Sequence, residues 1–224
     1  MAAAGVSEGW CAPAVREAFP ELRLVVAETG VAPAGWLSGT SPAGVRERLR
    51  ALSDRWSGAQ AVMVRRQPIP AAYRVFFRHI GLDPDVQRTP LEQAVLGRLI
   101  DGGFRSQGLL HDVLLLALID TSVPVWALDA DVLDGPLGVR LSTEGEPLGR
   151  AGEGPALAGG QLIVADSSAA VAVLFGEPSG VHMPTTHARR VTLFALQVQG
   201  VPAMHVEEAL WSCHTRLEWA AREL

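Results

Sequence analysis

The pattern of apolar and polar residues changes near residue 120. Before this point apolar residues recur at helical spacing, which predicts helices over residues 41–56, 70–80, 89–101 and 109–120. After it, short β-rich runs separated by Gly, Pro and Asp predict strands over residues 123–128, 137–141, 161–165, 169–175 and 191–199. An earlier strand is expected over residues 22–27 and a closing helix over residues 205–222. This order of elements predicts an α+β domain.

Local signals indicate where individual helices begin and end. Ser41 and Pro42 are typical of an N-cap followed by the first helical residue. Thr89 and Glu92 have the spacing of a capping box, and Gly102 is expected to end the helix that they start. Two apolar stripes are expected to face the interior: Val45, Leu49, Leu52 and Trp56 in the first helix, and Val206, Leu210, Cys213 and Leu217 in the last.

The length and composition fit a folded chain with its own core. The 224 residues suit one large domain, or a domain with an N-terminal extension. Hydrophobic residues make up 48% of the chain and charged residues 19%, which is typical of globular proteins. We expect residues 1–60 to form a strand-and-helix extension packed on a main domain of residues 61–224. The first nine residues are small and poorly patterned, so a loose end is expected there.

Several functional classes are disfavoured. The longest apolar run, residues 113–119, is far shorter than the roughly 20 residues of a membrane span, and no signal-peptide pattern is present. Cys11 and Cys213 are far apart and lack metal-ligand spacing, which favours a reduced cytoplasm and no metal site. The motifs of α/β-hydrolases, P-loop proteins and dinucleotide-binding folds are absent. The chain is therefore interpreted as a cytoplasmic protein without membrane association or cofactor. The sequence leaves its oligomeric state open, with a monomer as one possibility.

Charge is distributed unevenly along the chain. The net charge of −5 argues against a general nucleic-acid binder. Residues 1–110, however, carry 13 Arg against 10 acidic residues, whereas residues 111–224 carry 6 Arg against 14. One half could face phosphate while the other forms an acidic pocket, and the simpler alternative is that both are solvated surfaces.

Six short sequence pieces occur in a fixed order over residues 109–185. They are a helical aspartate (Asp112), a proline leading into an Ala-Leu-Asp-x-Asp strand end (Pro124, Ala127, Leu128, Asp129, Asp131), a glycine and a Val-Arg strand end (Gly135, Val139, Arg140), a Gly-Glu turn (Gly145, Glu146), an Ala-Asp strand end (Ala165, Asp166), and a loop followed by a threonine (Phe175 to Val181, Thr185). Together they resemble the B3/B4 editing domain of the bacterial phenylalanyl-tRNA synthetase β-chain and its standalone relatives. The resemblance covers roughly residues 70–211 and is weakest before residue 105.

The resemblance implies both a fold and an activity. The fold would be a three-layer domain with a sheet or sandwich core flanked by helices. The activity would be hydrolysis, in trans, of the ester that links a wrong amino acid to tRNA. Glu177 matches the family's pocket glutamate and would either read the amino acid or order the attacking water. Backbone N–H groups near Ser179 and Gly180 would bind the developing oxyanion. A solvated loop acid is the simpler interpretation of Glu177.

This chain departs from the family pattern at two pocket positions. Trp126 stands where the family has a histidine, and Leu114 stands near its threonine. Loss of both polar groups argues against the family's clearance of tyrosine from phenylalanine tRNA. With Asp112 or Asp129 close to Glu177, Trp126 would suit a cationic side chain such as canavanine carried on arginine tRNA. The simpler alternatives are a core aromatic for Trp126 and turn-capping carboxylates for the aspartates.

Further residues are assigned to chemistry and to tRNA contact. His182 is a candidate general base on a water molecule, Thr185 would contact substrate, and His187 is the weaker histidine of the two. His111, His205 and His214 are interpreted as structural or exposed. Residues 41–110 carry 11 Arg against 6 acids, and the arginines expected to contact tRNA phosphates are Arg46, Arg50, Arg65, Arg66 and Arg78.

Two rival functions stay open at this stage. One is a non-catalytic tRNA-binding or amino-acid-sensing module that kept the fold, which the loss of the family's histidine and threonine favours. The other is a hydrolase of small esters or amides that does not use tRNA, which the net charge of −5 favours.

Overall fold

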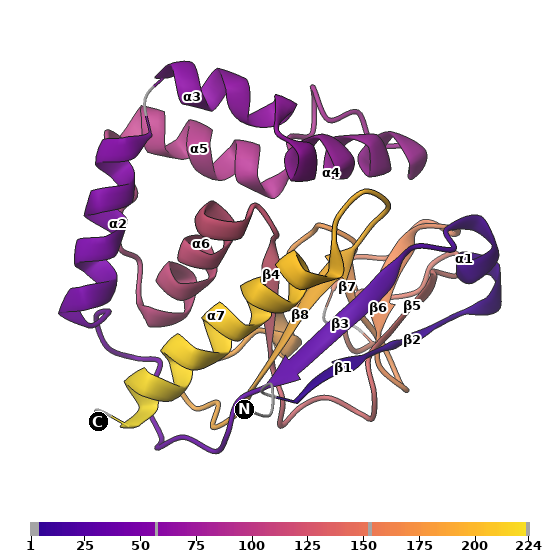
Figure 1. Ribbon diagram of the computed structural model, residues 1–224. Coiled ribbons are helices and arrows are strands. Elements are labelled where there is room, and N and C mark those ends of the chain that lie inside the picture. Colours follow the sequence, from indigo (N-terminus) through magenta and orange to yellow (C-terminus); the bar gives the residue numbers. More distant parts are fainter. Residues whose placement is uncertain (1–4, 57, 152–153, 223–224) are drawn as a thin grey trace.

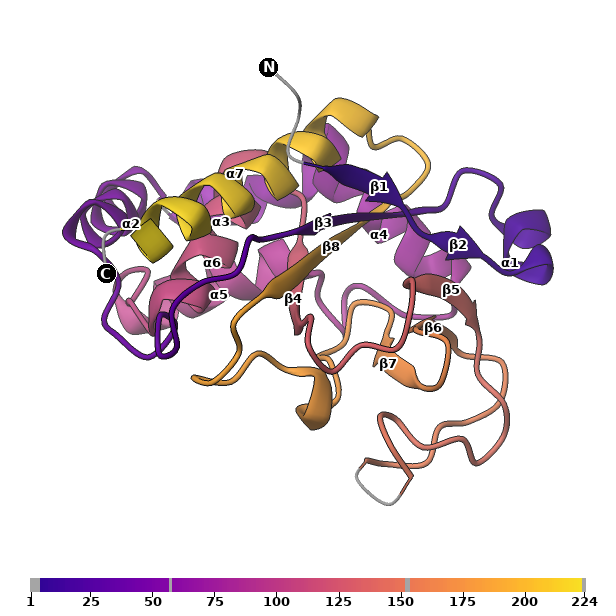
Figure 2. The same ribbon diagram turned by 90° about the horizontal axis from the view of Figure 1, so that it is seen from below.

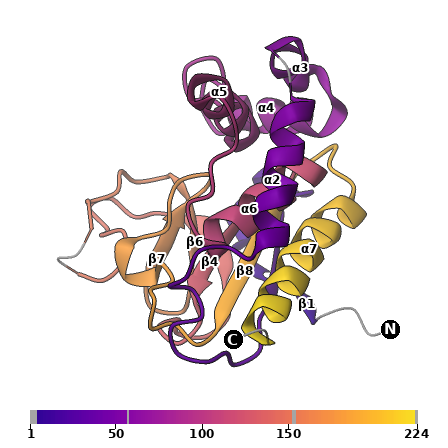
Figure 3. The same ribbon diagram turned by 90° about the vertical axis from the view of Figure 1, so that its left-hand side faces the viewer.

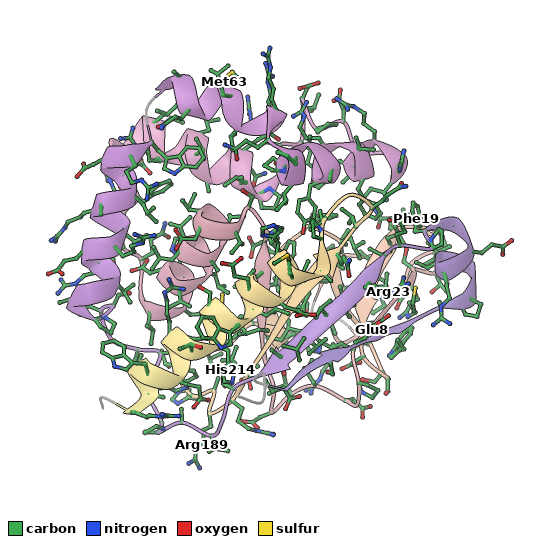
Figure 4. All side chains as sticks on the ribbon, in the orientation of Figure 1. Glu8, Phe19, Arg23, Met63, Arg189 and His214 are labelled. Carbon is green, nitrogen blue, oxygen red and sulfur yellow. The ribbon has the colours of Figure 1, made fainter. Side chains whose placement is uncertain are left out.

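The computed structural model describes residues 5–56, 58–151 and 154–222, which form two four-stranded sheets and a set of helices (Figure 1). The first sheet is antiparallel throughout and has the order β1-β3-β8-β4. Its strands are β1 (Val6–Glu8), β3 (Arg23–Glu28), β4 (Val125–Asp129) and β8 (Val191–Gln197). Glu8 and Arg23 lie together on β1 and β3, where they form an ion pair of 3.2 Å (Figure 4).

The second sheet has the order β2-β5-β6-β7, with β2 and β5 parallel and the other pairs antiparallel. Its strands are β2 (Trp10–Cys11), β5 (Gly138–Leu141), β6 (Leu162–Ala165) and β7 (Ala170–Val173). Gly9 carries the chain from one sheet to the other. A Cβ atom at this position would lie 2.6 Å from the carbonyl oxygen of Leu137, so a side chain would displace the backbone.

Most of the helices gather on one side of the molecule (Figures 1 and 3). Two of them, α6 (Leu109–Thr121) and α7 (Ala203–Arg222), pack on each other and on strands of the first sheet. An outer set surrounds α6: α2 (Ala43–Arg55), α3 (Gly58–Met63), the 3-10 turn η1 (Val64–Arg66), α4 (Pro68–His79) and α5 (Pro90–Asp101). A short helix α1 (Pro13–Ala18) lies at the opposite end, beside β5, and a second 3-10 turn, η2, spans Gly180–His182 (Figure 2). The predicted α+β fold is confirmed.

Two hydrophobic clusters hold these layers together. The larger cluster joins both sheets with α4, α6 and α7, and the residues predicted for the inner stripe of α7 are all fully buried: Val206, Leu210, Cys213 and Leu217. The smaller cluster joins α2, α5 and α6, and contains Val45, Leu49 and Leu52 of the predicted stripe on α2, with Trp56 packed against it. Amphipathic spacing therefore predicted the inward faces of both helices.

The capping box that starts α5 is confirmed. The Thr89 side chain accepts the Glu92 N–H, and the Glu92 carboxylate accepts the Thr89 N–H. Gly102 ends the helix with a φ of +77°. The expected N-cap at Ser41 is wrong. Helix α2 begins at Ala43 without a side-chain cap, and the Ser41 hydroxyl donates instead to the Asp112 carboxylate, at 2.6 Å. Because the hydroxyl is bonded to this buried carboxylate, it does not cap the helix.

The expectation of a loose start is wrong for residues 6–9, and residues 1–4 lie outside the described part of the chain. Strand β1 pairs with β3, and the Gly9 N–H donates to Leu24 at 2.8 Å. Strands from before residue 60 thus belong to both sheets, and the division into residues 1–60 and 61–224 stays a prediction. Sequence patterning also missed α1 and α3, each only six residues long. Within the described ranges, none of the helices has both the length and the apolar character needed to cross a membrane.

Candidate functional site

A cavity of about 350 Å³ lies where α5, α6, β4 and the loop after β7 meet. Its lining residues are Pro90, Gln93, Ala94, His111, Leu114, Leu115, Leu118, Pro124, Val125, Trp126 and Glu177. Three of them, Leu114, Trp126 and Glu177, were predicted from the sequence to form a substrate pocket. They come from a helix, a strand and a loop that are far apart in the chain, so the fold brings these three together.

Aromatic contacts fix the position of Trp126 in the cavity wall. Its ring stacks on Phe194, with centroids 5.4 Å apart and planes 13° from parallel, and it meets Phe175 edge-on at 5.8 Å. Phe194 is the direct partner of Trp126 in the pairing of β4 with β8. Trp126 is only half-buried, so part of its surface faces the cavity. The residue is therefore both a packed aromatic and an available surface for a ligand.

Glu177 is exposed and sits in a loop that is anchored on both sides. On one side, Phe175 has a φ of +62°, a conformation that costs an L-residue about 1–2 kcal/mol. Its ring compensates by packing against Phe77 and Trp126, with centroids 4.7 and 5.8 Å away. On the other side, the Ser179 N–H donates to Val171 at 2.8 Å. The Glu177 carboxylate is thus carried at the cavity by a fixed loop.

His182 lies inside the protein behind this loop and is not a lining residue of the cavity. Its Nδ1 is 2.6 Å from the Ser179 hydroxyl, and its Nε2 is 3.9 Å from the Asp166 carboxylate. Burial alone would raise the pKa of Asp166, but N–H groups of Asp134, Ser168 and Ala169 donate to the carboxylate and the pKa lies below its usual value. This buried chain of polar groups connects the Glu177 loop to β6 and holds it. The predicted role of His182 as a base on substrate water gains no support from its position.

The other residues predicted to contact substrate occupy different places. Asp112 is fully buried and accepts hydrogen bonds from Ser41, Ser106 and the Gln107 N–H, the last at 2.8 Å. Asp129 is also buried, and its carboxylate accepts the Asp131 N–H at 3.0 Å, as a turn-capping group does.

Three predicted substrate contacts lie beyond the loop. The Ser179 N–H is already used by Val171 and is therefore not available to an oxyanion. Gly180 begins η2 and is exposed. Thr185 is exposed as well, and its hydroxyl accepts the His187 N–H at 3.2 Å. The structure does not bring these three residues to the cavity lining.

The arginines predicted to contact tRNA all lie on the outer helical layer and are exposed. Arg46 and Arg50 are on α2, Arg65 and Arg66 are in η1, and Arg78 is on α4, where its guanidinium is 3.9 Å from the Asp85 carboxylate. This layer borders the side of the cavity formed by α5 (Figure 1).

Sequence reasoning missed two polar residues of the cavity, Gln93 and His111. His111 was interpreted as structural or exposed. A signal was nevertheless present, because His111, Leu114 and Leu118 are spaced three and four residues apart and so share one face of α6. A pocket predicted at Leu114 therefore also predicts His111 as a lining residue.

Other hollows exist but collect no predicted residues. One of about 440 Å³ lies beside Phe19 and His79, and one of about 570 Å³ lies where Arg48 and Arg216 both pair with Asp120. Among the described residues, no group of three or more His, Cys, Asp or Glu side chains is arranged to hold a metal ion. We therefore take the cavity at Glu177 as the candidate site.

Comparison with known proteins relates the chain to subunits of an aminoacyl-tRNA synthetase. No protein-family model matches it. It is 36% identical over 88 residues to the phenylalanine–tRNA ligase β subunit of Xanthomonas oryzae pv. oryzae, which covers 39% of this chain and 10% of that subunit. It is 40% identical over 68 residues to the same subunit of Xanthomonas euvesicatoria pv. vesicatoria, which covers 30% of this chain and 8% of the subunit. The chain is thus related to this subunit over part of its length and matches only a tenth of the subunit or less.

Proposed function

We propose that this protein hydrolyses the ester bond of misacylated tRNA in trans, in the manner of the B3/B4 editing domain that it resembles. The observation that carries the proposal is the meeting of Leu114, Trp126 and Glu177 in one cavity. These residues occupy the positions that the sequence resemblance assigns to the family's pocket. Partial similarity to phenylalanine–tRNA ligase β subunits supports a substrate attached to tRNA.

The cavity suits one amino acid held at the end of a longer molecule. Its volume of about 350 Å³ is at the lower end of the roughly 300–1,000 Å³ that ligand sites occupy. Its walls are largely apolar, and Glu177 is the one acidic group among the described lining residues. A carboxylate at this position pairs with the α-ammonium of an aminoacyl ester or with a cationic side chain.

The wall residues favour a cationic amino acid over tyrosine. Trp126 offers an aromatic surface for a guanidinium-like group, and Glu177 offers the opposite charge. Leu114 and Trp126 lack the hydroxyl and the imidazole of the family's pocket, which weakens the basis for selecting tyrosine. Canavanine on arginine tRNA is therefore the substrate favoured here, ahead of tyrosine on phenylalanine tRNA.

The chemistry needs little beyond placement. An aminoacyl ester is activated, so a positioned water molecule and an oriented carbonyl supply much of the rate. The family resemblance implies that the neighbouring ribose hydroxyl assists. In this arrangement Glu177 holds the ammonium group and thereby fixes the ester carbonyl at the cavity mouth.

A non-catalytic tRNA-binding or amino-acid-sensing module is the second candidate. The apolar residues at Leu114 and Trp126 favour it, because both replace polar groups of the family's pocket. Such a module would bind tRNA or amino acid without turnover, so catalysis separates the two candidates.

The test is release of amino acid from a panel of charged tRNAs that includes canavanine on arginine tRNA and tyrosine on phenylalanine tRNA. We expect fast release from one pair and a fall in kcat/KM of about 10- to 100-fold in Glu177→Gln, the loss for one hydrogen bond to a charged group. Glu207→Gln is the matched control, because Glu207 is exposed on α7 away from the cavity. Release no faster than in buffer from every pair, with folded protein, would refute the deacylase and leave the binding module.

A further inference from the structure

His111 is the histidine that the structure brings to the candidate site. It lies in the first turn of α6 and lines the cavity together with Trp126 and Glu177. Its side chain is 46% exposed, so solvent and a ligand can both reach it. The family's pocket histidine is replaced by Trp126, and His111 enters the same cavity from a different element.

A buried carboxylate stands behind His111. Its Nδ1 is 3.4 Å from Oδ1 of Asp112, whose side chain is completely buried. Asp112 also accepts the hydroxyls of Ser41 and Ser106 and the Gln107 N–H. These donors come from the segment before α2 and from the loop before α6, so the carboxylate cannot turn away.

This contact determines which ring nitrogen of His111 is free to accept a proton. An Asp carboxylate accepts only, so the Nδ1 that faces it carries the proton in the neutral ring. The lone pair is then on Nε2, the nitrogen not held by Asp112. Many hydrolases activate a nucleophile with a histidine whose ring is oriented in this way by a neighbouring carboxylate.

We propose that His111 is the general base of the ester hydrolysis and that Asp112 is its positioning residue. The proposal rests on the deacylase function proposed above. His111 Nε2 takes a proton from water as the water oxygen bonds to the ester carbonyl carbon. The bond between that carbon and the ribose oxygen then breaks, and His111 returns the proton to the ribose oxygen. The products are free tRNA and the amino acid, which loses its acid proton to solvent.

The division of work between the two ionisable lining residues follows from their surroundings. Glu177 is acidic and exposed on the loop, which suits recognition of a cationic group. His111 carries an imidazole, which can accept a proton at one ring nitrogen while the other donates, and this suits proton transfer. The remaining polar lining residue, Gln93, can orient a group but cannot accept a proton in this way.

The experiment measures steady-state release from canavanyl-tRNA for arginine and tyrosyl-tRNA for phenylalanine, with four proteins: wild type, His111→Gln, His111→Ala and His214→Gln. His214 is the matched control, because it is a half-buried histidine on α7 (Figure 4). We expect His111→Gln to lower kcat by about 100-fold or more, the contribution of a general base, with little change in KM. We expect added imidazole to restore part of the rate in His111→Ala and to leave wild type and His214→Gln unchanged.

The outcomes separate this proposal from the function on which it rests. If wild type releases amino acid and His111→Gln does so at the same kcat, His111 is not the base, although the deacylase stands. A loss of rate in His111→Ala that imidazole does not restore also refutes the role as a base, because a structural role alone would lose rate without rescue. If wild type releases nothing from these two tRNAs or from any other charged tRNA of the panel, both proposals fail. Circular dichroism of each variant verifies the fold, and His111→Asn replaces His111→Gln if that variant is unfolded.

Discussion

Phe175 offers a direct test of how the Glu177 loop is held. Its backbone has a φ of +62°, and its ring meets four other aromatic rings. The centroid distances are 4.7 Å to Phe77, 5.8 Å to Tyr73, 5.8 Å to Trp126 and 5.9 Å to Phe76. Phe175→Ala removes the ring and keeps a Cβ in the left-handed conformation. Phe175→Gly removes both the ring and the backbone strain.

The expected magnitudes follow from these two contributions. Truncation of a buried Phe to Ala costs about 3–5 kcal/mol, and because this ring is half-buried we expect about 2–3 kcal/mol for Phe175→Ala. A Cβ in the left-handed region costs about 1–2 kcal/mol, whereas the greater freedom of unfolded Gly costs about 0.5–1 kcal/mol. Phe175→Gly should therefore be more stable than Phe175→Ala by roughly 0.5–1 kcal/mol. In a helix or strand the order is the reverse.

The assay is urea unfolding followed by circular dichroism, with the free energy of unfolding extrapolated linearly to water. An Ala variant that is more stable than the Gly variant would refute the argument from backbone strain. Either variant within about 0.5 kcal/mol of wild type, the size of an ordinary surface change, would refute the argument that the aromatic cluster anchors the loop.

Two further predictions concern charge. The guanidinium of Arg140 lowers the pKa of the Glu146 carboxyl to about 2 in the folded protein, so this pair stabilises the fold above pH 4.5 and the contribution disappears as the pH falls toward 2. Glu146→Gln should cost about 1–2 kcal/mol at pH 7, and urea unfolding at lower pH should show the difference from wild type shrinking; a difference that is constant with pH would contradict the assignment. On the outer helical layer, we expect replacement of Arg46 and Arg50 by Gln to make tRNA binding less dependent on salt. The slope of log K against log salt concentration should fall by about one unit for each phosphate that an arginine no longer neutralises. Arg16→Gln on α1 should leave this slope unchanged. Equal slopes for all three proteins, measured by filter binding, would exclude this layer as the tRNA surface.

Local chemistry was sufficient to predict much of the fold. The capping box at Thr89 and Glu92 involves residues three apart, so it acts wherever the helix is placed. The inward faces of α2 and α7 follow from helical spacing alone. The same local logic failed at Ser41, whose hydroxyl is bonded to a buried carboxylate 71 residues further along the chain. Nothing near Ser41 in sequence signals that partner.

At the candidate site, too, some features follow from the sequence and others from contacts between distant segments. The family resemblance pointed to the positions of Leu114, Trp126 and Glu177, although Leu and Trp replace the family's threonine and histidine. Their meeting in one cavity depends on how α6 packs beside β4 and on the packing of the Phe175 ring against Phe77 and Trp126, which are long-range contacts. Tertiary structure alone put Asp112 and His182 in the interior, and it brought the face of α6 that carries His111 and Leu114 to the cavity. The sequence determined which chemical groups are available, and packing between distant segments decided which of them meet.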